Sequence, residues 1–118
     1  MKADDIPWSD PVRLAELIQS DPSHVTPLML ERLLEHAGFV DAGTMPTVGG
    51  TRCVVWAHRS RQTHPQLARF RVLVYQTPLV GEFRVISAMR TLQQAAGTLV
   101  SCGLAADEVI LITKNMIP

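Results

Sequence analysis

The chain lacks several features that would assign it at once to a class of protein. Its 118 residues include no apolar run near the roughly 18 residues that a membrane-spanning helix requires, so no membrane partner is expected. The opening residues, Met1 to Asp5, are charged and have no apolar core, which is unlike a secretory signal. With 47% apolar residues, the composition is that of a globular chain, and we expect one cytoplasmic domain spanning residues 1–118.

Signatures of enzyme chemistry are also scarce. The sequence has no glycine-rich dinucleotide or phosphate-binding motif and no serine-centred elbow, so no cofactor is predicted. The two cysteines, Cys53 and Cys102, lie in apolar surroundings, which favours buried reduced thiols, although a disulfide between them stays open. His58 and His64 share their segment with no Asp, Glu or Cys, so neither is expected to bind a metal.

Acidic residues are missing from the middle of the chain, where none occurs between Asp41 and Glu82. Residues 1–41 carry three basic and eight acidic groups, whereas residues 42–106 carry one acidic group and seven arginines: Arg52, Arg59, Arg61, Arg69, Arg71, Arg84 and Arg90. Guanidinium groups suit phosphate because they present a planar fork of donors, so this split indicates a nucleic-acid or other polyanion surface. A second interpretation stays open, in which the basic segment faces the acidic one.

Capping residues followed by proline mark two helices in the first third of the chain. They open a helix over residues 11–20 and a second over residues 27–36, which Gly38 ends. We treat residues 1–24 as an N-terminal helical extension and residues 25–118 as the core of the domain.

Strand patterns dominate the rest of the chain. Strands are predicted over residues 51–57, 69–75 and 109–113, with a polar loop over residues 58–68 and a helix over residues 82–101. The strand over residues 69–75 directs Phe70, Val72 and Val74 to one face and Arg69, Arg71, Leu73 and Tyr75 to the other.

The helix over residues 82–101 has an expected apolar stripe, in which Gly97 suggests close packing or an early break. The stripe contains Phe83, Ile86, Met89, Leu92, Ala96, Leu99 and Val100. Strand, helix and strand in this order predict a C-terminal βαβ unit, in which residues 70–75 and 109–113 are parallel neighbours. The strands over residues 51–57 and 69–75 are expected to pair antiparallel. The expected fold class is α/β (α+β), a mixed sheet with helices on its faces.

Three stretches of the sequence carry a resemblance to a known family. Leu30 to Phe39 looks like a first helix ending in a Gly-aromatic pair, and Val48 to Arg52 occupies the place of a Gly-Gly-x-Asp turn. Val80–Gly81, the helix after it and Val109 to Thr113 look like a crossover helix and a terminal Ile-Thr strand. Together, over residues 28–114, they resemble the Mrr-type restriction endonuclease domain of the PD-(D/E)XK nuclease superfamily. The resemblance implies a restriction-endonuclease-like fold.

The residues that give that family its chemistry are replaced. The family holds Mg²⁺ with an aspartate after Gly-Gly and a Glu or Gln at the next strand end, and a lysine two residues on helps to position water. In this chain the three positions are Arg52, Gln76 and Pro78, and the helical acid that the family often adds falls near Pro27. The resemblance therefore implies a degenerate site with no catalytic residues of the family type.

The resulting hypothesis is a nuclease-like domain without nuclease activity that binds DNA or another nucleic acid through phosphate contacts. One alternative is a regulatory module that binds a protein partner or forms a homodimer. Another is an active metal-dependent nuclease whose acidic residues have migrated, with Asp41 and Glu82 as candidates. The residues expected to contact nucleic acid are Arg52, Arg59, Arg61, Arg69, Arg71 and Arg84.

Overall fold

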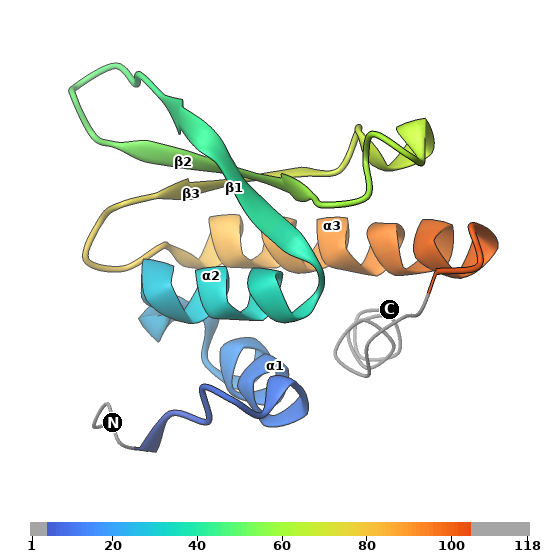
Figure 1. Cartoon of the computed structure of the whole chain (residues 1–118). Coiled ribbons are helices and arrows are strands. Elements are labelled where there is room, and N and C mark those ends of the chain that lie inside the picture. The colour runs from blue at the N-terminus through green and yellow to red at the C-terminus, as the bar shows by residue number, and fades with distance from the viewer. Residues whose placement is uncertain (1–4, 105–118) are drawn as a thin grey trace.

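The computed structural model describes residues 5–104, which form a mixed α+β arrangement of three helices and a three-stranded sheet (Figure 1). In chain order the elements are α1 (Pro11–Ser20), the 3₁₀ turn η2 (Pro22–His24), α2 (Pro27–His36), β1 (Phe39–Met45), β2 (Cys53–His58), the 3₁₀ turn η3 (Pro65–Leu67), β3 (Arg71–Tyr75) and α3 (Glu82–Ser101). The expected strand over residues 109–113 lies outside the described residues.

The first two helices begin where the capping pattern predicts. A carboxylate oxygen of Asp10 accepts the backbone N–H of Arg13 at the start of α1, and the hydroxyl of Thr26 accepts that of Met29 at the start of α2. In both helices proline occupies the first turn, where a missing N–H costs nothing. Gly38 follows the C-cap of α2 at a φ of 87°, a left-handed conformation that favours glycine.

The sheet has the order β1-β2-β3, and both strand pairs are antiparallel. The expected pairing of the strands around residues 51–57 and 69–75 is confirmed. β1 is longer than the strand fragment anticipated around residues 40–50, and an irregularity in its register falls between Asp41 and Thr44. The carboxylate of Asp41 accepts the N–H of Gly43 there at 2.8 Å.

The two faces of the sheet differ in burial, as the alternation predicts. Phe70, Val72 and Val74 join the core that α1, α2 and α3 share, whereas Arg71 and Leu73 are exposed on the other face. Figure 1 shows the three helices below the three strands. The N-terminal helix is part of this core, since Leu14, Ala15 and Ile18 of α1 are fully buried in it.

α3 has the expected bounds, but the predicted apolar stripe is partly wrong. Phe83 is 89% exposed and Val100 is 53% exposed, and Ile86 is also exposed, whereas Val85, Ala88 and Ala95 are buried. Compared with the predicted stripe, the face of α3 that meets the core is shifted toward its small residues. Alanines let a helix approach its neighbours more closely than bulky side chains do.

Gly97 does not break α3, and among the described residues nothing packs closely against it. The helix continues to Ser101, and a Cβ added at Gly97 would meet no atom within 4 Å in the described part of the chain. The expected early break at this glycine is therefore wrong, and within residues 5–104 no close packing is found there.

A contact between distant segments fixes the N-terminal helices to the rest of the fold. The backbone N–H of Val80 donates to the carbonyl of Val25 at 2.9 Å, and both side chains are buried. η2 also contacts α3. The connection that leads from β3 into α3 therefore lies against the chain between α1 and α2.

Both cysteines are free thiols. Cys53 is fully buried on β2, whereas Cys102 at the end of α3 is half-buried and its sulfur accepts a hydrogen bond from the side-chain amide of Gln66. Of the two expected buried thiols, only Cys53 is buried.

Candidate nucleic-acid interface

The register of β2 and β3 divides the arginines that were expected to bind nucleic acid. Arg71 lies next to Ala57 in the ladder, whereas the N–H of Gln76 donates to the carbonyl of Arg52 at 2.9 Å. Since strands rise by about 3.3 Å per residue, the two arginines lie on the order of 15 Å apart along the ladder. The structure places Arg52 beside Gln76, but it does not bring Arg71 to that end.

Four arginines gather instead at the end of the sheet where β2 leads into β3. We call them the loop arginines: Arg59, Arg61, Arg69 and Arg71. Three of them are exposed, and Arg61 is half-buried. The connection that carries them was expected to be a loop, and in the structure it is turns together with η3, whose Leu67 is buried in the core.

The loop arginines have no carboxylate partner among the described residues. The ion pairs in that part of the chain are Arg13–Asp10, His24–Asp21 and Arg32–Glu35, all within the acidic N-terminal third. Within residues 5–104 no ion pair joins a loop arginine to the acidic third, although Arg59 lines one pocket together with Glu35 and Asp41.

Contacts with neutral groups hold two of the loop arginines. The guanidinium carbon of Arg69 lies 4.8 Å from the centre of the Phe70 ring, and Nη1 of Arg61 donates to the carbonyl of His58 at 3.0 Å. Stacking on an aromatic face leaves the N–H edge of a guanidinium free. These contacts thus orient the charge without cancelling it.

Arg52 and Arg84 form a separate group near the other end of the sheet. Arg84, in the first turn of α3, places its guanidinium carbon 3.9 Å from the centre of the Tyr75 ring, and Tyr75 pairs with Cys53. The six arginines expected to act together therefore come in a set of four and a set of two.

The positions that resemble a degenerate nuclease site are adjacent in space. Arg52 and Gln76 are joined by their backbones, and Pro78 follows in the connection to α3. The structure adds a carboxylate that the sequence interpretation missed. Glu31 of α2 lies four residues after Pro27, and hence on the same helix face as the position assigned to the helical acid.

Glu31 of α2 lies close to side chains from β1, from β2 and from the residue that follows β3. Its carboxylate accepts the indole N–H of Trp56 at 3.1 Å. Burial raises the pKa of Glu31, and the nearby charge of Asp41 raises it further, whereas hydrogen bonds from Trp56 and Gln76 lower it. A pocket of about 380 Å³ beside β1 is lined by Asp41, Trp56 and Arg59 among others, so the Asp41 side of this cluster is open to solvent.

The two histidines of the basic segment differ in their surroundings. His58 is only 4% exposed and is bound to the backbone on both sides, whereas His64 is half-buried and its Nδ1 lies 3.1 Å from the hydroxyl of Thr63. Across residues 5–104 no three His, Cys, Asp or Glu side chains lie close enough to hold a metal ion.

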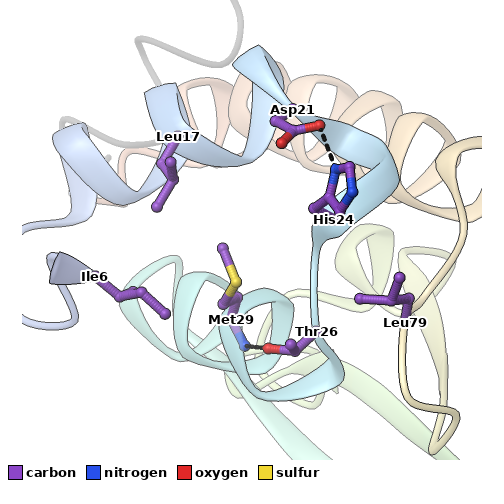
Figure 2. A pocket seen from close by; sticks show the side chains of 7 residues that line it. All are labelled: Ile6, Leu17, Asp21, His24, Thr26, Met29 and Leu79. Atoms are coloured by element: carbon purple, nitrogen blue, oxygen red, sulfur yellow. Dashed lines mark hydrogen bonds and ion pairs between the residues drawn. The ribbon is translucent and has the colours of Figure 1, made fainter. Parts of the chain in front are cut away.

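A second pocket, of about 410 Å³, lies between α1, the start of α2 and Leu79 (Figure 2). Ile6, Leu17, Met29 and Leu79 make its walls apolar, and Asp21, His24 and Thr26 supply its polar groups. The hydroxyl of Thr26 is occupied as the cap of α2.

The polar cluster at this pocket is not a nucleophile–base pair. Nδ1 of His24 lies 2.9 Å from Asp21 and 3.2 Å from the Ser23 hydroxyl, so both partners meet the same ring nitrogen. A catalytic triad needs the acid on one nitrogen and the nucleophile on the other. The hydrogen bond from His24 lowers the pKa of Asp21, as expected for a local turn.

No helix in the described part of the chain combines the length and apolar character needed to cross a membrane. Comparison of the chain with protein-family models, with curated proteins and with solved structures gave no match.

Proposed function

We propose that the chain is a nuclease-like domain that binds nucleic acid through phosphate contacts and has no nuclease chemistry of the family type. The observation that carries the proposal is the set of four loop arginines at one end of the sheet, without a carboxylate partner in the described residues. The order of α2, three antiparallel strands and α3 supports the restriction-endonuclease-like part of the proposal.

Phosphate contacts have a measurable signature. Each one releases condensed counterions, so the logarithm of the binding constant falls with the logarithm of salt concentration by about one unit per contact. Because phosphate contacts position a protein on nucleic acid but carry no sequence information, we expect weak dependence on base sequence.

The test is a fluorescence-anisotropy titration of single- and double-stranded oligonucleotides at two salt concentrations. The double variant Arg69→Glu with Arg71→Glu should lose binding at both concentrations and keep the wild-type circular dichroism spectrum. Arg13→Glu with Arg32→Glu is the matched control, since it changes the net charge equally on exposed helix positions in the acidic third. Equal losses of binding in the two variants would show that binding depends only on the net charge of the protein, which would contradict the proposal.

Absence of binding by the wild type at the lower salt concentration would reject a nucleic-acid role. A dimer in light scattering would then favour the interaction module, for which Phe83 and Leu73 are exposed apolar side chains.

One observation favours a second candidate function, metal-dependent cleavage of nucleic acid. The carboxylates of Glu31 and Asp41 are close enough for the charge of Asp41 to raise the pKa of Glu31, and Gln76 hydrogen-bonds the same group. Carboxylate and amide oxygens are ligands that Mg²⁺ accepts. The site fits a nuclease only in part, because Pro78 occupies the lysine position.

Incubation of supercoiled DNA and of RNA with the protein and Mg²⁺ or Mn²⁺ tests this second candidate. Cleavage that Glu31→Gln and Asp41→Asn both abolish, and that Glu82→Gln leaves intact, would establish it. No cleavage by the wild type would reject it.

A further inference from the structure

His58 is a buried side chain whose ring is bonded to the backbone on two sides. Its Nδ1 accepts the N–H of Ser60 at 3.1 Å, and the ring also hydrogen-bonds the backbone of Ala37 at the end of α2. The ring lies edge-on to Phe39, with centroids 5.4 Å apart. It also lies against Gly38, where an added Cβ would stand 2.8 Å from Nε2.

The same residue fixes the first turn of the loop that carries the arginines. The carbonyl of His58 accepts both the backbone N–H and the Nη1 of Arg61, at 3.2 Å and 3.0 Å. The N–H of Arg59 donates to the carbonyl of Gly38 at 3.0 Å. Two of the four loop arginines are thus held against the C-terminal end of α2 through His58 and its neighbours.

This arrangement requires the neutral ring, because an imidazolium carries hydrogen on both nitrogens and its Nδ1 cannot accept from Ser60. The charged and titratable groups that face the ring are Arg59, Arg61 and His64, all from the loop. From the C-cap of α2 the ring meets the backbone of Ala37, and from β1 it meets the Phe39 ring. Burial first, and Arg59 next, lower the pKa of His58.

We propose that neutral His58 is a positioning residue for the nucleic-acid site, and that protonation of its Nδ1 releases the turn that holds Arg59 and Arg61. This inference rests on the proposed function, and it adds a regulation of the same site by pH. Nucleic-acid binding should then weaken in acid.

The expected sign is opposite to that of simple electrostatics. Acidification makes the net charge of the chain more positive, and added positive charge strengthens attraction to a polyanion. A loss of affinity in acid would therefore show that the loop arginines are no longer held in place, because the added charge alone would raise the affinity.

The experiment follows oligonucleotide affinity from pH 7.5 down to pH 4.5 at constant ionic strength, for the wild type and for His58→Asn, because the pKa of His58 is lowered below its ordinary value of 6.5. Asparagine offers an oxygen near the place of Nδ1 and does not titrate. Wild-type affinity should fall several-fold in acid, whereas the affinity of the variant should stay constant or rise. A rise for the wild type, or the same fall for both proteins, would overturn the inference.

Amide hydrogen exchange on the wild type separates this inference from the proposed function and avoids a variant that fails to fold. The protection factors of the Ser60 and Arg61 amides should drop as His58 titrates, while those in β2 stay high. Unchanged protection would overturn the inference even where binding is seen. Lost protection in a protein that binds no nucleic acid would uphold the His58 turn and reject the proposed function.

Discussion

The indole of Trp56 donates to the carboxylate of Glu31 across 25 residues of sequence, and this bond ties β2 to α2. It lies beside Asp41 and Gln76, where the chain brings its acidic third against the ends of the central strands. The carboxylate that ties β2 to α2 is therefore also the group whose pKa the neighbouring charge of Asp41 raises, so the charge on Glu31 affects stability.

We predict that Glu31→Gln leaves the free energy of unfolding at pH 7 unchanged or raises it. Burial raises the pKa of Glu31 above its ordinary value of 4.5, so the folded protein holds this proton to a higher pH than the unfolded chain does. The stabilisation is complete below the ordinary value and is lost as the pH rises through the raised one. Glutamine keeps an acceptor for Trp56 without the charge.

Urea unfolding at pH 4 and pH 7 measures this effect. Glu35→Gln is the control, since Glu35 lies on the same helix, is exposed and pairs with Arg32. A loss of more than about 1 kcal/mol at pH 7 in Glu31→Gln would mean that the ionised carboxylate is needed for the bond to Trp56.

Gly38→Ala should be among the most destabilising single changes at a glycine. Its φ of 87° disfavours any side chain, and a Cβ would stand 2.8 Å from the buried ring of His58. Gly49→Ala has a similar φ of 94° but open space around it, so it isolates the backbone cost of about 1 kcal/mol. Thermal unfolding of both variants should show the larger loss for Gly38→Ala, and equal losses would mean that the ring moves aside freely.

Gly97→Ala should stabilise the protein by up to about 1 kcal/mol. The position is inside α3, has no left-handed φ and leaves room for a methyl group in the described structure. Gly81→Ala, at a φ of 100° on the N-cap of the same helix, should destabilise instead. A shift in the urea midpoint measures each effect, and a less stable Gly97→Ala would indicate a neighbour at that face of the helix.

The two thiols should differ in their reaction with a thiol-specific reagent. Cys102 is half-buried and should react in the native state, whereas Cys53 is fully buried, and burial raises the pKa of its thiol. Native protein should release one equivalent of chromophore quickly and the second only at the rate of unfolding. Cys102→Ser should remove the fast phase, and a persistent fast phase would mean that Cys53 is reached without unfolding.

Local signals predicted most of the fold. The caps at Asp10 and Thr26 and the buried face of β3 were predictable, because each depends on only a few consecutive residues. The caps follow from the residues next to them in the sequence, and the buried face of β3 follows from its alternation. The rotation of α3 was not predictable from hydrophobicity alone. Its contact face uses small residues such as Ala88 and Ala95, and the bulky Phe83 is left exposed.

The candidate sites were predicted less completely, because they depend on tertiary register. That Arg71 lies beside Ala57, and Arg52 beside Gln76, follows from the pairing of two strands, which composition does not determine. Glu31 was missed because, in sequence, it is one polar position on an amphipathic helix. The restriction-endonuclease-like assignment and the strand over residues 109–113 stay predictions.

The bond from Val80 to Val25 has a consequence for the order of folding. β1, β2 and β3 pair with their neighbours in sequence and close short loops, whereas this bond joins segments separated by the whole meander. Because loop closure costs entropy that grows with length, we expect the strands to pair before α1 and η2 dock. Truncation of Ile18 in α1 should then accelerate unfolding more than it slows folding, which stopped-flow kinetics in urea would measure.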